Sequence, residues 1–116
     1  MQRKFRLTRS QDFKRVRQSG KSYAHPLIVL IAQANEEMKI RVGVAAGRTV
    51  GGAVKRNRAK RLLREAMRPL LPALASGWDL LLIARPALPA SSPDETRGAL
   101  LQLLQRARLI SDPDAL

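Results

Sequence analysis

The stretch that decides the fold is GGAVKRNRAKRLLREAMR, which runs from Gly51 to Arg68. On a wheel of about 100° per residue, its apolar positions share an arc of about 100°. These positions are Ala59, Leu62, Leu63, Ala66 and Leu70. The pattern predicts a long helix over about residues 53–71 that packs one face on a core. Pro69 and Pro72 should frustrate its last turn.

Strand patterns lie on both sides of this helix. Residues 27–34 form a short apolar run with β-branched side chains, and residues 40–44 alternate apolar side chains with Arg41 and Gly43. Because only a short polar turn at residues 35–37 separates the two runs, we expect a tight antiparallel hairpin. After the helix, Trp78–Ala84 has the continuous apolar character of a central strand.

Two further helices are predicted near the ends of the chain. The first runs over Ser10–Gln18, with Ser10 as its cap, Asp12 at its positive end and Gly20 at its exit. The second begins at Ser92-Pro93-Asp94-Glu95, a sequence typical of a capping box. With an extra short strand near residues 22–24, the order becomes αβββαβα. The expected fold class is therefore α+β, a single small domain with helices packed on one four-stranded sheet.

The composition restricts the class of protein. A chain of 116 residues suits one domain, and 45% hydrophobic residues suffice for a core without disulfides or metal. The chain has no cysteine, which fits a cytoplasmic protein. A signal peptide is not expected because the basic N-terminus leads into no apolar stretch. No apolar run approaches the roughly 18–20 residues of a membrane span.

The charge is high and unevenly distributed. Lys and Arg number 22 against nine acidic residues, for a net charge of +13. Residues 1–68 hold 18 of the basic and four of the acidic residues, whereas residues 69–116 hold four and five. Such segregation indicates a binding surface for a polyanion. Nucleic acid is favoured over a membrane because no basic segment has a bulky aromatic face.

The basic residues of the central helix form a stripe opposite its apolar face. Asn57, Arg61, Arg64 and Arg68 fall within about 60° on the wheel, and Lys60 flanks them. Between Lys55 and Arg68, seven basic residues accompany a single acid, Glu65, which is placed to pair with Arg61. A solvated helix face is the alternative, but such faces usually mix charges of both signs. The helix dipole also disfavours cations in the first turn, where Lys55, Arg56 and Arg58 lie.

Residues 53–65, AVKRNRAKRLLRE, resemble the Arg-Asn-Arg signature of the bacterial ribonuclease P protein. Further marks follow in the expected order: Asp12-Phe13, the RVGV of residues 41–44, Asp79, and the IARP of residues 83–86. The resemblance covers about residues 5–108 of a single domain over 1–116, and leaves 109–116 as an expected disordered tail. It implies a left-handed βαβ crossover. It also implies a protein that binds a catalytic RNA and the 5′ leader of precursor tRNA, while the RNA subunit with Mg²⁺ removes the leader by endonucleolytic hydrolysis.

The resemblance also assigns expected contacts. Its motif matches Arg56, Asn57, Arg58, Lys60, Arg61 and Arg64 as RNA-binding residues, and the charge pattern adds Lys55 and Arg68. Arg48, just before the glycine loop, keeps one of two cations that the family has there. Phe13 matches an aromatic of the leader cleft. Arg17 and the Leu30–Ile31 position lack the family's further aromatics, so charge is favoured over stacking in this cleft.

No catalytic constellation is visible in the chain. His25 is the single histidine, Glu36-Glu37 lies in a turn, and Asp94-Glu95 is explained by helix capping. The glycine loop at residues 47–52 lacks the Gly-Lys-Ser/Thr ending of a nucleotide-binding loop. We therefore expect no catalytic residues and no metal or cofactor bound by the protein itself, which should be a monomer. Mg²⁺ would be used by the RNA subunit.

Two other nucleic-acid binders share the charge pattern. A ribosomal protein would have the same size and arginine content, and would copurify with ribosomal particles. A helix-in-groove binder of double-stranded nucleic acid would need a dimer or a helix-turn-helix, which the strands on both sides of the basic helix disfavour.

Overall fold

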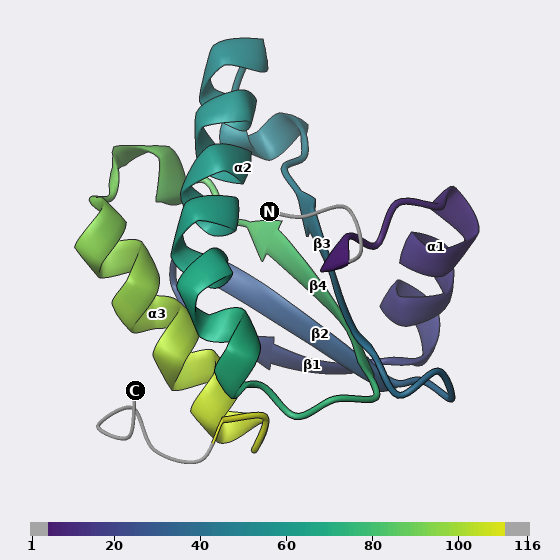
Figure 1. Cartoon of the computed structure of the whole chain (residues 1–116). Coiled ribbons are helices and arrows are strands. Elements are labelled where there is room, and N and C mark those ends of the chain that lie inside the picture. The colour runs from purple at the N-terminus through teal and green to yellow at the C-terminus, as the bar shows by residue number, and fades with distance from the viewer. Residues whose placement is uncertain (1–4, 111–116) are drawn as a thin grey trace.

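The structure, a computed structural model, describes residues 5–110. Its helices and strands are α1 (Ser10–Ser19), β1 (Lys21–Ala24), β2 (Ile28–Ala34), β3 (Ile40–Ala45), α2 (Ala53–Met67), β4 (Trp78–Ala84) and α3 (Pro93–Arg106). Three short 3₁₀ segments connect them: η2 (Arg48–Val50), η3 (Arg68–Ala73) and η4 (Leu88–Ala90). The expected order αβββαβα and the α+β class are confirmed (Figure 1).

The four strands form one mixed sheet in the order β1-β2-β4-β3. β2 pairs antiparallel with both β1 and β4, and β3 pairs parallel with β4. The predicted hairpin between β2 and β3 is therefore wrong, because β4 lies between them. The polar turn between β2 and β3 passes around the start of β4 and is bonded to Gly77, the residue before that strand. Asn35 N–H donates to Gly77 O at 2.8 Å, and Gly77 N–H donates to Lys39 O at 2.9 Å. The position of β4 between β2 and β3 is favoured because this strand has apolar side chains on both faces. It therefore needs a hydrogen-bonded strand on each edge and a covering layer on each face.

The connection from β3 through α2 to β4 joins two adjacent parallel strands. In Figure 1 both strands point toward the top, α2 lies in front of the sheet, and β4 lies to the left of β3. This arrangement makes the crossover left-handed, the hand that βαβ units rarely adopt. The resemblance to the ribonuclease P protein implies this hand. The periodicity of the sequence alone does not indicate it.

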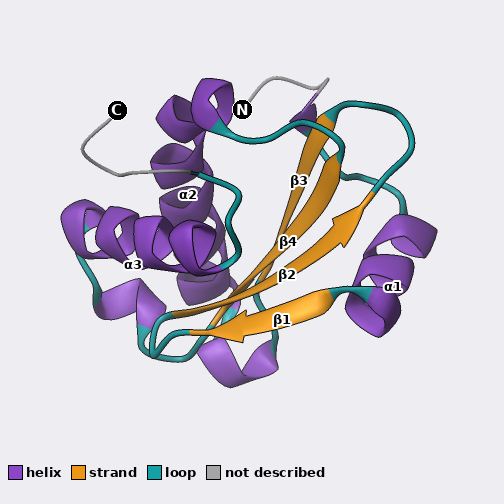
Figure 2. Cartoon of the chain, turned by 90° about the horizontal axis from the view of Figure 1, so that it is seen from below, coloured by secondary structure: helices purple, strands orange, loops and turns teal. Residues whose placement is uncertain are grey.

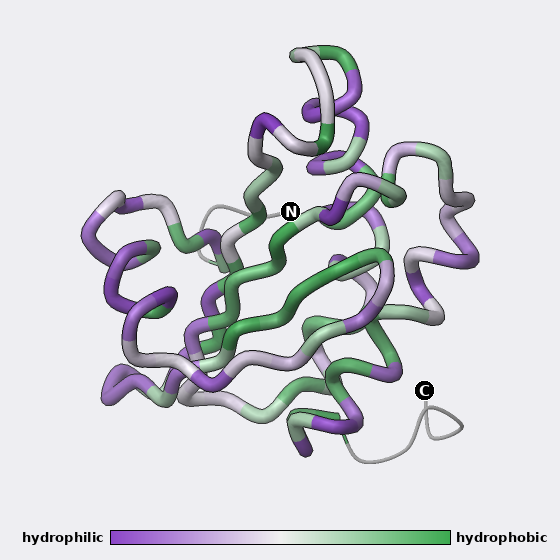
Figure 3. The backbone as a smooth tube through the Cα atoms, turned by 180° about the vertical axis from the view of Figure 1, so that it is seen from behind, coloured by the Kyte–Doolittle hydropathy of each residue, from purple (hydrophilic) through white to green (hydrophobic). Residues whose placement is uncertain are grey.

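Helices cover both faces of the sheet (Figure 2). The larger core lies between the sheet and helices α2 and α3, and it includes Ile28, Leu30, Leu80, Leu82, Leu63 and Leu100. On the opposite face α1 covers a smaller cluster that contains Leu7, Val16, Ile31 and Leu81. Alternate residues of β2 and β4 therefore enter different cores, and Figure 3 shows the hydrophobic central strands between more hydrophilic helices.

The helix ends agree with the sequence for α3 and differ for α1. The capping box is confirmed, because Glu95 N–H donates to Ser92 Oγ at 3.1 Å and Ser92 N–H donates to the Glu95 side chain at 3.0 Å. The cap of α1 is Arg9 without a side-chain bond, and Ser10 is the first helical residue. Gly20 has an ordinary negative φ; it is needed because a Cβ there would lie 2.6 Å from Ile31 Cγ2.

Residues 109 and 110, which were expected to belong to a disordered tail, are packed against the core. Leu109 and Ile110 are buried, and Leu109 N–H donates to Leu104 O at 2.9 Å. Arg108, with φ of 58°, turns the chain back after α3 so that these two apolar side chains reach the core. The rest of the expected tail, residues 111–116, lies outside the described residues. Within residues 5–110 no helix has the length and apolarity needed to cross a membrane.

Candidate RNA-binding surface

The basic stripe lies on the face of α2 that points away from the core. The buried side of this helix consists of Ala59, Leu62, Leu63, Ala66 and Met67, close to the predicted set. Asn57, Arg61 and Arg68 on the opposite side are exposed, and Arg64 is half-buried. The first turns of α2 project beyond the edge of the sheet (Figure 1). The structure therefore brings the predicted stripe together on one accessible surface.

The cations of α2 have almost no acidic partners. Of the seven basic residues from Lys55 to Arg68, only Arg68 forms an ion pair in the part of the chain that the structure describes, with Glu65 at 2.7 Å. The anticipated pairing of Glu65 with Arg61 is not made. Arg58 Nε donates to Pro89 O at 2.7 Å, which directs this guanidinium toward η4 and α3. Like charges at this spacing repel one another, so the surface lacks a counter-charge that a polyanion would supply.

The glycine loop adds one more cation near the start of α2. Arg48 is exposed in η2, immediately before the loop that leads into the helix. Gly51 adopts a φ of +135°, and a Cβ at this position would lie 2.7 Å from Lys55 Cδ. Glycine is required here for the backbone conformation, and its lack of a side chain also leaves room for the aliphatic part of Lys55. Arg48 therefore extends the stripe beyond the helix, next to the first turn that holds Lys55.

The residues expected in the leader cleft lie on the other face of the sheet. Phe13 is half-buried in the α1 cluster, and a Cβ at Gly43 would lie 2.7 Å from Phe13 Cζ, so the ring rests on the β3 backbone. Ile31 belongs to the same cluster but is only 5% exposed beneath α1. Arg17 is exposed in the last turn of α1. Of the three, Ile31 contributes to packing and leaves little surface for a ligand.

Three small or aliphatic residues on this face were missed by the sequence reasoning. Val29, Ala45 and Ile83 are half-buried and adjoin the α1 cluster. They occupy neighbouring positions across the sheet, since Val29 pairs with Ile83 and Ile83 with Ala45. The continuous apolar run of β4 concealed which of its side chains face α1. The pairing with β2 and β3 was needed to identify this row.

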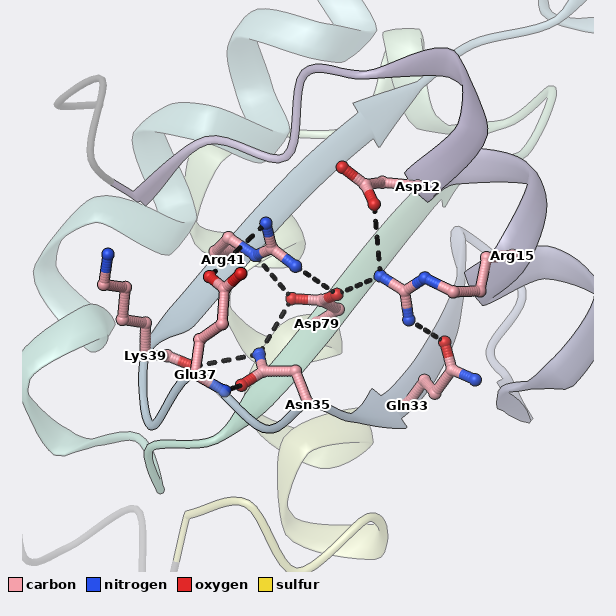
Figure 4. A network of polar contacts seen from close by, with 8 residues as sticks. All are labelled: Asp12, Arg15, Gln33, Asn35, Glu37, Lys39, Arg41 and Asp79. Atoms are coloured by element: carbon pink, nitrogen blue, oxygen red, sulfur yellow. Dashed lines mark hydrogen bonds and ion pairs between the residues drawn. The ribbon is translucent and has the colours of Figure 1, made fainter.

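A buried carboxylate holds α1 against the sheet (Figure 4). Asp79 on β4 is fully buried and accepts two hydrogen bonds from Arg41 on β3, each 2.9 Å long. It also accepts one from Asn35 Nδ2 at 2.9 Å and one from Arg15 on α1. Arg15 binds Gln33 on β2 as well. One carboxylate on β4 thus connects α1 to β3 and to the turn after β2. From the sequence, Asp79 was only a mark of resemblance.

The hydrogen bonds decide the charge of this carboxylate. Burial alone would raise the pKa of Asp79, but the bonds from Arg41, Arg15 and Asn35 outweigh burial and leave its pKa below the ordinary value. The same bonds raise the pKa values of Arg15 and Arg41. All three groups therefore stay charged at neutral pH, and Arg15 and Arg41 are largely committed to structure.

A comparison with known proteins gives the family of this chain. The family model for ribonuclease P matches residues 1–108. The chain belongs to the ribonuclease P protein family. The ribonuclease P protein component of Herpetosiphon aurantiacus is 38% identical over 112 residues, which cover 97% of this chain and 91% of the relative. That of Dehalococcoides mccartyi is 41% identical over 106 residues, covering 91% and 87%.

Solved structures of ribonuclease P proteins share the fold. The protein from Staphylococcus aureus superposes with a TM-score of 0.83 at 26% identity, covering 92% of this chain and 98% of that one. The protein from Thermotoga maritima gives 0.77 at 30% identity, covering 87% and 96%. The chain is thus the RNA-binding protein component of the endoribonuclease ribonuclease P, which acts in the processing of tRNA 5′ ends, and ribonuclease P RNA is its partner. The ribosomal and helix-in-groove alternatives do not hold.

The histidine and the two turn glutamates considered in the sequence show no catalytic arrangement in the structure. His25 Nδ1 accepts a hydrogen bond from Leu27 N–H at 3.0 Å in the turn between β1 and β2. Glu36 and Glu37 are exposed, and Glu37 lies 3.7 Å from Arg41. Among residues 5–110 there is no group of three histidine or acidic side chains placed to hold a metal ion.

We expect Asp79→Asn to lower the free energy of unfolding at pH 7 by about 3 kcal/mol, because it leaves Arg15 and Arg41 without their buried counter-charge. The pKa of Asp79 is lower in the folded state than in the unfolded chain, where it is about 3.9. The ionised carboxylate therefore stabilises the fold above that pH, and this contribution is lost as the pH falls below about 4. Urea unfolding at pH 7 and pH 3 measures both effects, and the variant should lose less stability on acidification. Glu36→Gln, at an exposed position in the turn between β2 and β3, serves as the control; an equal loss there would contradict a special role for Asp79.

Proposed function

We propose that the basic face of α2, together with Arg48 and Lys55, binds the catalytic RNA of ribonuclease P. The observation that carries this proposal is the accessible run of arginine and lysine in which, among residues 5–110, only Arg68 has an acidic partner. The guanidinium group of arginine can donate two parallel hydrogen bonds to the oxygens of a phosphate. The N-terminal turn of α2 adds free backbone amides, which favour anions. Because burial of the apolar side fixes the helix, these cations would meet the RNA in a preformed array.

The α1 face of the sheet is proposed to receive the 5′ leader of precursor tRNA. Its accessible parts are the half-buried ring of Phe13, the exposed Arg17, and the row of Val29, Ile83 and Ala45. A single aromatic ring can stack on one base, whereas the other positions offer aliphatic contact or charge. We therefore propose a leader contact that depends on charge and on one stacking position.

The chemistry would belong to the RNA subunit, which uses Mg²⁺ to hydrolyse the phosphodiester bond. The protein would contribute a dense positive charge that replaces counterions otherwise supplied by Mg²⁺. We propose that it acts as a monomer in the holoenzyme and binds no cofactor of its own. As the tRNA-processing subunit of a bacterial enzyme, it would act in the cytoplasm.

Reconstitution with a cognate ribonuclease P RNA tests this division of labour. We expect the protein alone, freed of RNA, to leave precursor tRNA intact, and the complex to cleave at a lower Mg²⁺ concentration than the RNA does by itself. Cleavage is followed by gel electrophoresis of labelled precursor tRNA over a Mg²⁺ titration. Specific 5′ cleavage by the RNA-free protein would falsify the proposal.

We expect Lys60→Ala with Arg64→Ala to weaken binding to the catalytic RNA and to reduce its salt dependence. Each phosphate contact contributes about 0.7–0.9 to the slope of log K against log salt, so the slope should shrink by about 1.4–1.8. Filter binding at several salt concentrations measures the slope. The charge-matched control, Lys39→Ala with Arg108→Ala, changes exposed residues outside the stripe and should leave the slope nearly unchanged. Equal slopes for both double variants would mean that α2 presents only a solvated face.

Phe13→Leu separates stacking from packing in the leader cleft. Leucine retains apolar bulk against Gly43, so the loss of stability should stay below about 1.5 kcal/mol. Loss of a stacked base should cost roughly 1–3 kcal/mol of affinity for precursor tRNA, with little change for mature tRNA. The two affinities are compared with the reconstituted complex. Wild-type preference for precursor tRNA in a stable variant would show that the ring only fills the core.

A further inference from the structure

A groove runs between α2 and α3, on the side of the basic stripe that faces α3. The two helices lie side by side in Figures 1 and 2. The groove has a volume of about 470 Å³, within the range of about 300–1,000 Å³ that holds small organic ligands. Its apolar lining consists of Leu62, Ala66, Pro69 and Pro93. Leu62 and Ala66 are nearly buried and form the floor, whereas both prolines are exposed.

The polar residues of the groove carry both signs of charge. Three arginines line it, Arg58 and Arg61 from α2 and Arg97 from α3. Arg58 is fixed by its bond to Pro89 O, while Arg61 belongs to the stripe itself. Two carboxylates line the same groove: Glu65, which is paired with Arg68 at 2.7 Å, and Asp94, which forms no ion pair among the described residues. A site for phosphate alone would be weakened by two carboxylates, so the arginines do not account for the groove.

A nucleotide has the chemistry that this combination would recognise. Its phosphate suits arginine, its base suits flat apolar surfaces, and the amino groups on the edges of adenine, cytosine and guanine are donors to carboxylates. RNA is read in this way mostly where nucleotides are unpaired and turned out of the helix. The groove adjoins the stripe through Arg61, so a backbone that follows α2 passes its opening.

We propose that the groove between α2 and α3 binds one unpaired nucleotide of the catalytic RNA, with its base on the apolar floor and an amino group directed to Glu65 or Asp94. The inference rests on the proposed binding of that RNA by α2, and it adds a site of base recognition to a surface otherwise suited to phosphates. Phosphate contacts position an RNA but carry no sequence information. The groove therefore fixes the register of the protein on its RNA.

Charge-removing variants distinguish base recognition from simple attraction. Glu65→Gln with Asp94→Asn makes the protein more positive, so phosphate attraction alone predicts tighter binding to the cognate catalytic RNA. Base recognition predicts weaker binding, by about tenfold for one lost base contact. The control is Glu36→Gln with Glu37→Gln in the exposed turn between β2 and β3, which changes the charge equally and should not weaken binding. Thermal unfolding verifies that both double variants fold.

Site-specific crosslinking locates the nucleotide. The chain has no cysteine, so Pro69→Cys provides a single attachment point for a photoreactive group at the groove, and Glu36→Cys provides a distant control. We expect the first to crosslink to one unpaired base of the catalytic RNA, and the second not to share that crosslink. Crosslinks confined to paired stems, or tighter binding by the Glu65 and Asp94 variant, would overturn the proposal. So would a change in self-association without a change in RNA affinity.

The two proposals fail in different ways. Lys60 and Arg64 do not line the groove, so they report on the stripe alone. If their alanine variant weakens RNA binding while the groove variants do not, the proposed nucleotide site in the groove is wrong, and the proposed RNA-binding face of α2 is supported. If neither set of variants affects binding, the proposed role of α2 falls as well.

Discussion

The hydrogen bonding of β4 to both β2 and β3 is the constraint on which the rest of the structure depends. Apart from Asp79 the strand is apolar, and it is buried on both faces, so it needs a neighbour on each edge and helices on each side. Its entry between β2 and β3 converts a potential hairpin into a mixed sheet and makes α2 a crossover helix. The single buried charge on this strand, Asp79, then determines where α1 can attach.

The separation of structural and functional charges follows from this arrangement. Arg15 and Arg41 are neutralised by Asp79 and stabilise the fold, whereas the arginines of α2 are held by the apolar side of their helix and have almost no acidic partners. Burial of side chains such as Leu62 and Leu63, each worth roughly 1.5–3 kcal/mol, offsets the repulsion among exposed cations. A surface with unpaired positive charge is therefore stable before any RNA binds.

The sheet also separates two proposed surfaces of one ribonucleoprotein subunit. The face with α2 and α3 presents the stripe and the groove, and the face with α1 presents Phe13 and the aliphatic row. Because both are attached to the same rigid strands, the positions of catalytic RNA and leader would be related through the sheet. Glycines permit this geometry where backbone and side chain approach closely, as Gly43 does beneath Phe13.

The sequence by itself determined the helices, the strands, the apolar side of α2 and its basic stripe, because each depends on residues within a few positions of one another. It also identified the capping box of α3 and, through the Arg-Asn-Arg motif, the family. Only the tertiary structure decided that β4 separates β2 from β3, and that Asp79 on β4 joins α1 to β3 and to the turn after β2. The groove between α2 and α3 likewise combines residues about 30 positions apart. A local pattern shows which side chains an element buries, but the partner against which it buries them is chosen by competition among all the elements for the same core.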